Sequence, residues 1–97
     1  MIYLDNAATS FPKPEEVYRA MDEFARQSLG NPGRSGHRMA KASEAVLEDC
    51  RHQLNRLLGG ADASRWALAL NCTDALNMAI KGTLAAGDHA VTTDLEH

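Results

Sequence analysis

The sequence predicts an α/β fold with a strand–helix–strand crossover in its second half. A short apolar run without Gly, Pro or charge, Trp66 to Leu70, suits a strand buried on both faces. After a polar turn, apolar residues recur at helical spacing, and Gly87-Asp88 then leads to a second extended segment, His89 to Thr93. Two more helical patterns precede this unit. We therefore divide the chain into residues 1–60, a loop and two helices, and residues 61–97, the start of an α/β domain.

The amino-terminal segment predicts a loop that leads into a helix. Ile2 to Leu4 are extended, and residues 5–10, DNAATS, are small and without periodicity. Such a stretch is either a surface connection or a backbone that passes close to another group. Pro14 suits the first position of a helix, and the acidic residues Glu15 and Glu16 complement the positive end of its dipole.

Two helices are expected before the crossover. The first should span Pro14 to Ser28, with Gly30 as its stop, because one face carries Val17, Ala20, Met21, Phe24 and Ala25. The loop Gly30 to Gly36, GNPGRSG, has the composition of a turn. The second helix should span His37 to Leu58 and end at Gly59-Gly60, because its apolar face carries Met39, Ala42, Val46, Cys50, Leu54, Leu57 and Leu58.

Individual side chains of the second helix also carry predictions. His37 stands at the turn into the helix, where a capping or structural hydrogen bond is expected. Cys50 lies on the apolar face and is predicted to be a core residue. The charged residues of this helix lie mostly on the other side and predict a solvated face.

The turn Asn71 to Thr73 predicts either an anion site or an ordinary helix cap. A helix that begins just after a strand points its first backbone N–H groups out of the sheet's carboxyl edge, where a phosphate binds. Thr73 is the expected N-cap and adds a hydroxyl donor. A plain capped helix shows the same residues, so both interpretations stay open on this pattern alone.

Composition excludes several classes of function. A net charge of -3 provides no basic stripe for nucleic acid or for an anionic membrane surface. The start MIYLDN is far shorter than the apolar region of a signal peptide, and no stretch approaches membrane-spanning length, so a cytoplasmic protein is expected. Two cysteines without metal-ligand spacing predict neither a disulfide framework nor a metal site.

The two predicted strands bear on whether these residues form a finished domain. A parallel sheet of two strands is not a normal finished domain. We therefore expect these 97 residues to be the opening portion of a longer protein, or to be completed by a partner.

Four motifs in order, YLDNAATS, GNPGRSGH, NCTDALNMAIKG and TTDLEH, resemble the class V aminotransferase superfamily and, within it, the cysteine desulfurases. The resemblance covers essentially the whole chain. It implies the amino-terminal portion of the pyridoxal-phosphate-dependent transferase fold (type I, aspartate-aminotransferase-like). It also implies a cytoplasmic homodimer that converts L-cysteine to L-alanine and passes sulfur to an enzyme thiol, a sulfur-acceptor protein, and a link to iron–sulfur cluster assembly.

The resemblance also implies site residues. Cys72 and Thr73 match the loop that holds the phosphate of pyridoxal phosphate, with Cys72 contributing its backbone and not acting as the nucleophile. His97 matches the catalytic histidine that stacks on the pyridine ring, and an imidazole suits acid or base work near neutral pH. Asn6, Ala7 and Ala8 match the loop that borders the substrate pocket.

Other residues that the family requires are expected after His97. These are the Schiff-base lysine, the acid that pairs with the pyridine nitrogen, and the persulfide-forming cysteine; Lys13, Lys41 and Lys81 stand in the wrong contexts. The chain alone is therefore expected not to turn over substrate. Selenocysteine lyases and kynureninase-like or epimerase-like members of class V are alternatives, and so is a non-catalytic domain that binds a partner.

Overall fold

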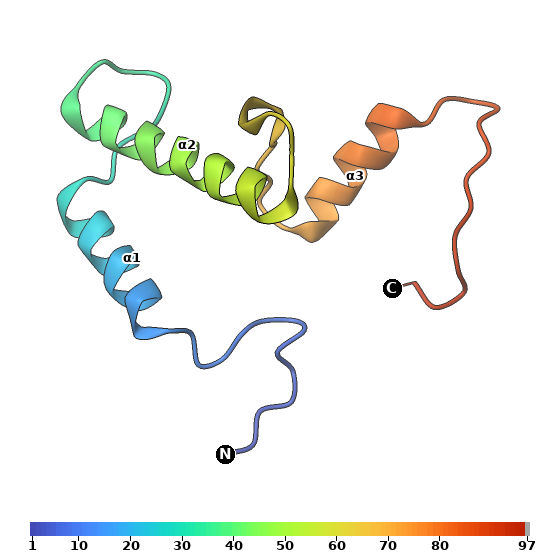
Figure 1. The fold of residues 1–97 in the computed structure, drawn as a ribbon, viewed down its shortest axis with the longest axis horizontal. Coiled ribbons are helices and arrows are strands. Elements are labelled where there is room, and N and C mark those ends of the chain that lie inside the picture. The colour runs from blue at the N-terminus through green and yellow to red at the C-terminus, as the bar shows by residue number, and fades with distance from the viewer. Residues whose placement is uncertain (97) are drawn as a thin grey trace. The chain divides into compact units, whose positions relative to one another are not determined.

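The computed structural model describes residues 1–96 and divides into two compact units, Met1–Ser64 and the segment from Arg65 onward (Figure 1). The elements in order are α1 (Glu15–Gln27), α2 (Arg38–Leu58), a 3-10 helix η1 (Ala63–Arg65) and α3 (Cys72–Thr83). The three predicted α-helices are all present, and the bounds of α1 and α2 lie within one residue of those expected from the apolar periodicity.

The two predicted strands do not form. Residues 66–70 and 89–93 belong to no strand, and residues 1–96 contain helices only, so the strand–helix–strand prediction is wrong for the part of the chain that the structure describes. A strand exists only where a neighbouring segment supplies ladder hydrogen bonds, and here neither segment has such a neighbour. The apolar side chains of these segments include Leu70, 91% exposed, and Val91, 88% exposed.

Helix α1 begins one residue later than predicted. Pro14 is the N-cap, with φ -53° and ψ 142°, and not the first helical residue. Its fixed φ suits both positions, but its extended ψ places it outside the helix. Glu15 and Glu16 lie in the first turn, as expected, and the helix ends when the amide of Ser28 donates to the carbonyl of Phe24 at 3.0 Å.

Helix α2 is capped at both ends by residues that were predicted from the sequence, His37 and Gly59. The Nδ1 atom of His37 accepts a hydrogen bond from the amide of Ala40 at 3.2 Å, which confirms the predicted cap. Gly59 ends the helix in the left-handed region, at φ 67°, and the amide of Gly60 donates to the carbonyl of Asn55 at 2.8 Å.

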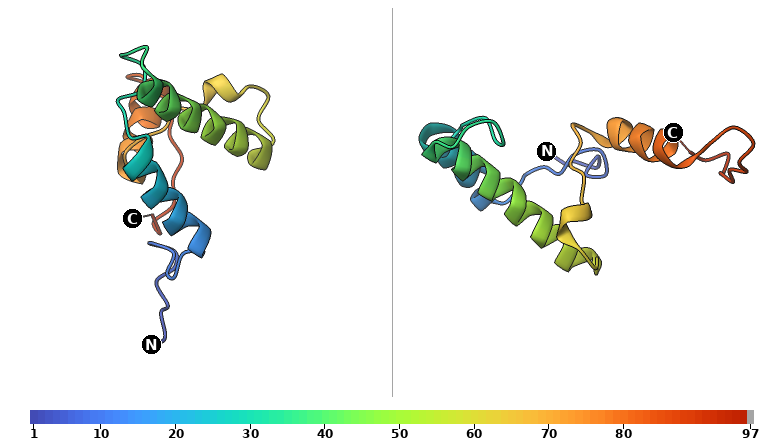
Figure 2. Two further views of the ribbon diagram at one scale, coloured as in Figure 1. Left: turned by 90° about the vertical axis from the view of Figure 1, so that its left-hand side faces the viewer. Right: turned by 90° about the horizontal axis from the view of Figure 1, so that it is seen from above.

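Helices α1 and α2 meet at a corner formed by the end of α1 and the start of α2 (Figure 2). Gly30 was expected to end α1, but α1 ends earlier, and Gly30 instead lets the chain approach α2. A Cβ atom on Gly30 would lie 2.7 Å from the carbonyl carbon of Met39 and 2.8 Å from the nitrogen of Ala40. Ala40 is 1% exposed and Ser43 is 5% exposed, so part of the core of the first unit lies at this corner. Ala63 in η1, 9% exposed, is buried away from it.

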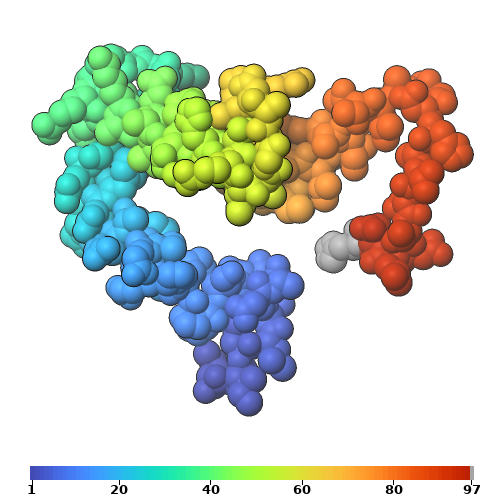
Figure 3. All heavy atoms as spheres, in the orientation of Figure 1, coloured from blue at the N-terminus to red at the C-terminus, as the bar shows by residue number. Residues whose placement is uncertain are grey.

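Away from the corner, much of the apolar face of α2 is exposed. Cys50 was predicted to be a core residue, but it is exposed, and Leu57 is 78% exposed. These residues lie in later turns of α2, beyond the corner where α1 meets the start of the helix, and among those later turns Leu54 is half-buried. Figure 3 shows the atoms of α2, in green, at the surface.

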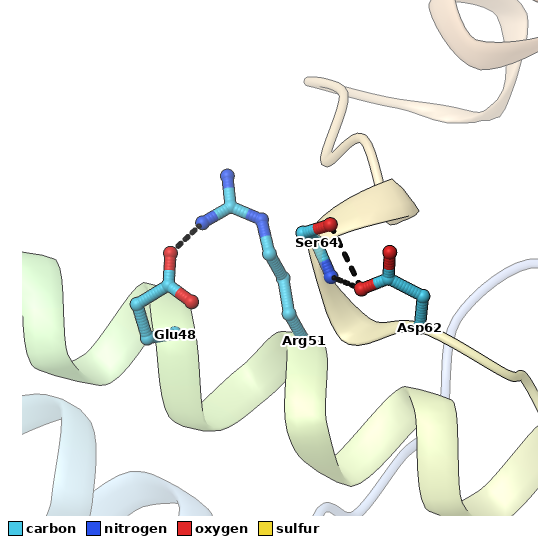
Figure 4. Close-up of polar contacts among 4 residues, drawn as sticks. All are labelled: Glu48, Arg51, Asp62 and Ser64. Carbon is cyan, nitrogen blue, oxygen red and sulfur yellow. Dashed lines mark hydrogen bonds and ion pairs between the residues drawn. The ribbon is translucent and has the colours of Figure 1, made fainter.

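A polar turn connects α2 to η1. The Oδ1 atom of Asp62 accepts hydrogen bonds from the hydroxyl of Ser64 at 2.8 Å and from its amide at 2.9 Å (Figure 4). These two bonds lower the pKa of the Asp62 carboxyl, the hydroxyl having the larger effect. Arg51, also drawn in Figure 4, donates to Glu48 at 2.8 Å. Asp62 thus fixes the turn that leads into η1.

None of the helices in residues 1–96 is both long enough and apolar enough to span a bilayer. Within the same residues, no group of three or more His, Cys, Asp or Glu side chains is arranged to hold a metal ion.

Candidate functional site

The candidate site is the amino-terminal end of α3, and Asn71 caps it. Asn71 is extended, with φ -159° and ψ 175°, and its Oδ1 atom accepts a hydrogen bond from the amide of Asp74 at 2.9 Å. Thr73 was predicted to be the N-cap, but it is the second residue of the helix. Asn and Thr are both good caps, and Asn71 takes the role because the helix begins at Cys72.

The cap leaves donors available at the start of α3. In any α-helix the first amides have no intrahelical acceptor, and in α3 the side chain of Asn71 takes only that of Asp74. The amides of Cys72 and Thr73 and the hydroxyl of Thr73 therefore remain as donors at an exposed helix terminus. Asn77 steadies this turn, because its Nδ2 atom donates to the carbonyl of Thr73 at 2.9 Å.

Two hollows flank this end of α3. The first, here called the Lys81 hollow, is lined by Leu70, Asn71, Thr73, Asp74, Asn77 and Lys81. The second, the Glu96 hollow, is lined by Cys72, Thr73, Leu76, Asn77, Ile80, Thr92 and Glu96. Thr73 and Asn77 line both hollows, so the turn that bears the Thr73 hydroxyl lies between them. The Lys81 hollow contains a cation and an acid, Lys81 and Asp74, and the Glu96 hollow contains an acid only.

The Glu96 hollow brings together two motifs that are distant in the sequence. Cys72 and Thr73 come from the NCTDALNMAIKG motif, and Thr92 and Glu96 come from the TTDLEH motif. The latter segment is locally ordered, because Thr93 Oγ1 donates to Glu96 at 3.0 Å and accepts from the amide of Leu95 at 3.3 Å. The predicted catalytic residue His97 lies outside the described residues.

The charges around α3 decide what kind of ligand suits each side. Asp74 in the first turn interacts favourably with the helix dipole but repels an anion, whereas Lys81 attracts one. The combination of free amides, a hydroxyl and an ammonium group suits a phosphate, with Asp74 as the opposing contribution.

The predicted substrate-loop residues Asn6, Ala7 and Ala8 lie together in one turn of the first unit. The amides of Ala8 and Thr9 donate to the carbonyl of Asp5 at 3.1 and 3.3 Å. The side chain of Asn6 also shapes this loop, since its Oδ1 atom accepts from the amide of Phe11 at 3.0 Å. The loop is thus an ordered surface connection, with small residues at its exposed side.

Sequence reasoning missed several residues with structural roles at these sites. Asn71 had a signal, because an Asn followed three residues later by an acid is a variant of the capping box. Tyr3 and Asn77 had none, because their hydrogen bonds go to backbone carbonyls, and no sequence pattern marks such contacts.

The Aminotransferase class-V family model matches residues 2–97. The chain belongs to the class V aminotransferase family. Among curated relatives, this class V chain is 35% identical to "Cysteine desulfurase IscS" of Dictyoglomus turgidum over 100 residues, which is 99% of the chain and 25% of the relative. It is 33% identical to "Probable cysteine desulfurase" of Halobacterium salinarum, over 100% of the chain and 24% of that relative.

A third relative, "Cysteine desulfurase IscS" of Glaesserella parasuis, is 34% identical to the class V chain over 99% of the chain and 25% of the relative. The chain thus spans about a quarter of the length of the curated relatives it matches. No solved structure matches it significantly. Family membership confirms the resemblance drawn from the four motifs.

Proposed function

We propose that this chain is the amino-terminal part of a cysteine desulfurase, an enzyme that converts L-cysteine to L-alanine and passes the sulfur to an enzyme thiol. The observation that carries the proposal is the family match over residues 2–97, together with curated relatives named cysteine desulfurase that match almost the whole chain. The activity belongs to the whole protein, because the chain spans only about a quarter of those relatives.

The parent protein would adopt the α/β fold of pyridoxal-phosphate-dependent transferases, with residues 1–60 as a loop and two helices and residues 61–97 as the start of the cofactor domain. The segments 66–70 and 89–93 would become strands once neighbouring segments supply ladder hydrogen bonds.

We further propose a cytoplasmic homodimer with a sulfur-acceptor protein as partner and a role in iron–sulfur cluster assembly. These features follow from the resemblance to the cysteine desulfurases.

Pyridoxal phosphate would supply the electron sink that weakens bonds at the α and β carbons of the substrate. The residues of this chain fit its phosphate end. The amides of Cys72 and Thr73 and the hydroxyl of Thr73 would donate to the phosphate, and the positive end of the α3 dipole would favour its charge.

The remaining predicted residues would act on the substrate side. His97 would hold or release a proton at its imidazole, close to neutral pH. The position of its neighbours supports this assignment, because Thr92 and Glu96 line the same hollow as Cys72 and Thr73. Asn6, Ala7 and Ala8 would border the substrate, and their small side chains leave room beside the backbone.

The test is a product assay on the full-length protein. Purified protein that carries pyridoxal phosphate is given L-cysteine and a thiol reductant, and alanine and sulfide are measured together. We expect both products in equal amounts. A parallel assay with selenocysteine distinguishes a selenocysteine lyase, which would prefer that substrate. Absence of alanine with either substrate would contradict the proposed function.

A second assay addresses the chain by itself. Residues 1–97 with pyridoxal phosphate and L-cysteine are expected to give no alanine, because the cofactor-linking lysine and the sulfur-accepting cysteine are expected elsewhere in the parent. Protein-dependent alanine from this chain would contradict that expectation.

A further inference from the structure

The turn that carries Asn6, Ala7 and Ala8 is held closed by a phenol. Tyr3 is half-buried, and its Oη atom lies 2.8 Å from the carbonyl oxygen of Thr9 and 3.2 Å from that of Asp5. A phenol has a single hydrogen, so the donation is shared between these two carbonyls. They stand at the two ends of the turn, and Tyr3 therefore joins its beginning to its end.

A second contact anchors Tyr3 beyond the turn. Its ring meets the ring of Phe11 edge-on, with centroids 5.6 Å apart and planes at 70°. The amide of Phe11 in turn donates to Oδ1 of Asn6 at 3.0 Å. Phe11 thus contacts both Tyr3 and Asn6, in a segment that has no regular secondary structure.

The hydrogen bond from Phe11 also determines how the side-chain amide of Asn6 is oriented. Because the amide of Phe11 is a donor, the atom of Asn6 that faces it is the carbonyl oxygen, and the side chain's acceptor is used inside the loop. The two N–H donors on Nδ2 remain on an exposed residue. The loop therefore presents hydrogen-bond donors at Asn6, which suit an anionic or carbonyl acceptor on a ligand.

We propose that Tyr3 is a positioning residue that holds this turn so that the Nδ2 hydrogens of Asn6 meet the carboxylate of the amino-acid substrate. The inference rests on the proposed function, which places an amino acid beside Asn6. A loop ordered in advance loses less conformational freedom when the substrate binds. Loss of the phenol should therefore raise KM and leave kcat nearly unchanged, because the contact is made with the bound substrate before and during the reaction.

The test compares Tyr3→Phe with Tyr18→Phe in the full-length protein. Phenylalanine keeps the ring that contacts Phe11 and removes only the hydroxyl. Tyr18→Phe is a matched control, because it removes a phenol that accepts a hydrogen bond from the amide of Lys13 at 3.2 Å, outside the Asp5–Thr9 turn. Two quantities are measured: KM and kcat for L-cysteine, and hydrogen exchange of the peptide covering residues 4–12 in the cofactor-free protein.

For Tyr3→Phe we expect about tenfold faster exchange in residues 4–12 and a KM raised about tenfold, as for the loss of one hydrogen bond, with kcat within about twofold. Tyr18→Phe should leave KM and this exchange unchanged. Unchanged exchange or an unchanged KM in Tyr3→Phe would overturn the inference, as would an equal effect of Tyr18→Phe.

A second variant keeps the inference testable if Tyr3→Phe does not fold. Asn6→Asp retains an oxygen that accepts from Phe11, so exchange in residues 4–12 should stay as in the wild type. It replaces the Nδ2 donors with a negative charge, so KM should rise at least tenfold. A wild-type KM in Asn6→Asp would overturn the inference. Failure of the proposed function is separate, because the wild-type protein would then form no alanine from cysteine.

Discussion

The backbone amide of Gly30 donates a hydrogen bond to Oγ of Ser43 at 3.0 Å, across the corner between α1 and α2. The hydroxyl of Ser43 donates in turn to the carbonyl of Ser28 at 3.4 Å. Ser43 is 5% exposed, so water cannot replace either bond unless the corner opens. One hydroxyl on α2 therefore satisfies both a donor and an acceptor of the segment that leaves α1.

Ser43→Ala should destabilise the first unit. The substitution leaves the amide of Gly30 without an acceptor at a part-buried position, which costs about 1–3 kcal/mol. The measurement is the free energy of unfolding in urea of the full-length protein, with amide exchange of α1 and α2 to locate the change. Ser35→Ala is the control, because Ser35 is exposed in the loop between the helices. Equal stability of the two variants would contradict the role of Ser43.

Gly30→Ala should also open the corner, for a steric reason. The added Cβ would lie 2.7 Å from the carbonyl carbon of Met39, and a backbone atom cannot yield as the end of a side chain can. Overpacking of this kind costs about 1–3 kcal/mol. Gly36→Ala is the matched control, since no atom lies within 4 Å of its Cβ position. Thermal unfolding of both variants should show a lower Tm for Gly30→Ala only.

Substitutions at Asn71 and Thr73 should have different effects, the first on the stability of α3 and the second on the binding of the cofactor. Asn71→Ala removes the cap on Asp74 and should destabilise α3 by about 0.5–2 kcal/mol. Thr73→Val keeps the shape of the side chain and leaves the cap intact, but removes a donor to the proposed phosphate. Amide exchange in α3 should therefore rise only in Asn71→Ala, while Thr73→Val should weaken retention of pyridoxal phosphate in dialysis. A stable α3 in Asn71→Ala would argue against the cap.

The two cysteines should respond differently to the cofactor. Both Cys50 and Cys72 are exposed in this chain, but only Cys72 lies at the start of α3. In the full-length protein, a thiol reagent should modify Cys72 faster without pyridoxal phosphate than with it, and the rate at Cys50 should not depend on the cofactor. Peptide mapping after labelling gives each rate. Equal labelling of Cys72 in both states would remove it from the proposed phosphate site.

The lowered pKa of Asp62 predicts that the protein loses a small part of its folding stability in acid. Its pKa is lowered by hydrogen bonds from the hydroxyl and the amide of Ser64, so the ionised form is favoured in the folded state. The stabilisation is present above the ordinary pKa of 3.8 and is lost as the pH falls through the lowered value. An NMR titration of the Asp62 carboxyl should give an inflection below 3.8, and Ser64→Ala should raise it. An inflection that Ser64→Ala leaves unchanged would contradict this cause.

Local patterns predicted the helices well, because helix formation depends on neighbours within one or two turns. The bounds of α2, its cap at His37 and its end at Gly59 all follow from such neighbours. The four motifs likewise indicated the family, which the match over residues 2–97 confirms.

Contacts between distant segments were not predictable in the same way. The strands at 66–70 and 89–93 were predicted from apolar composition, but a strand also needs a partner segment. The bond between Gly30 and Ser43 joins residues 13 positions apart, and neither residue carries a pattern that announces it. Cys50 was assigned to the core from its face of α2, yet periodicity does not say what covers that face.

The corner at Ser43 also has a consequence for the order of events during synthesis. Its hydrogen bonds span only 13 and 15 positions of the chain, so closing it requires a short loop and little entropy. All of its atoms are available as soon as Ser43 has left the ribosome. The corner can thus form while the ribosome is still translating the residues that begin α3, before any contacts of the later segments exist.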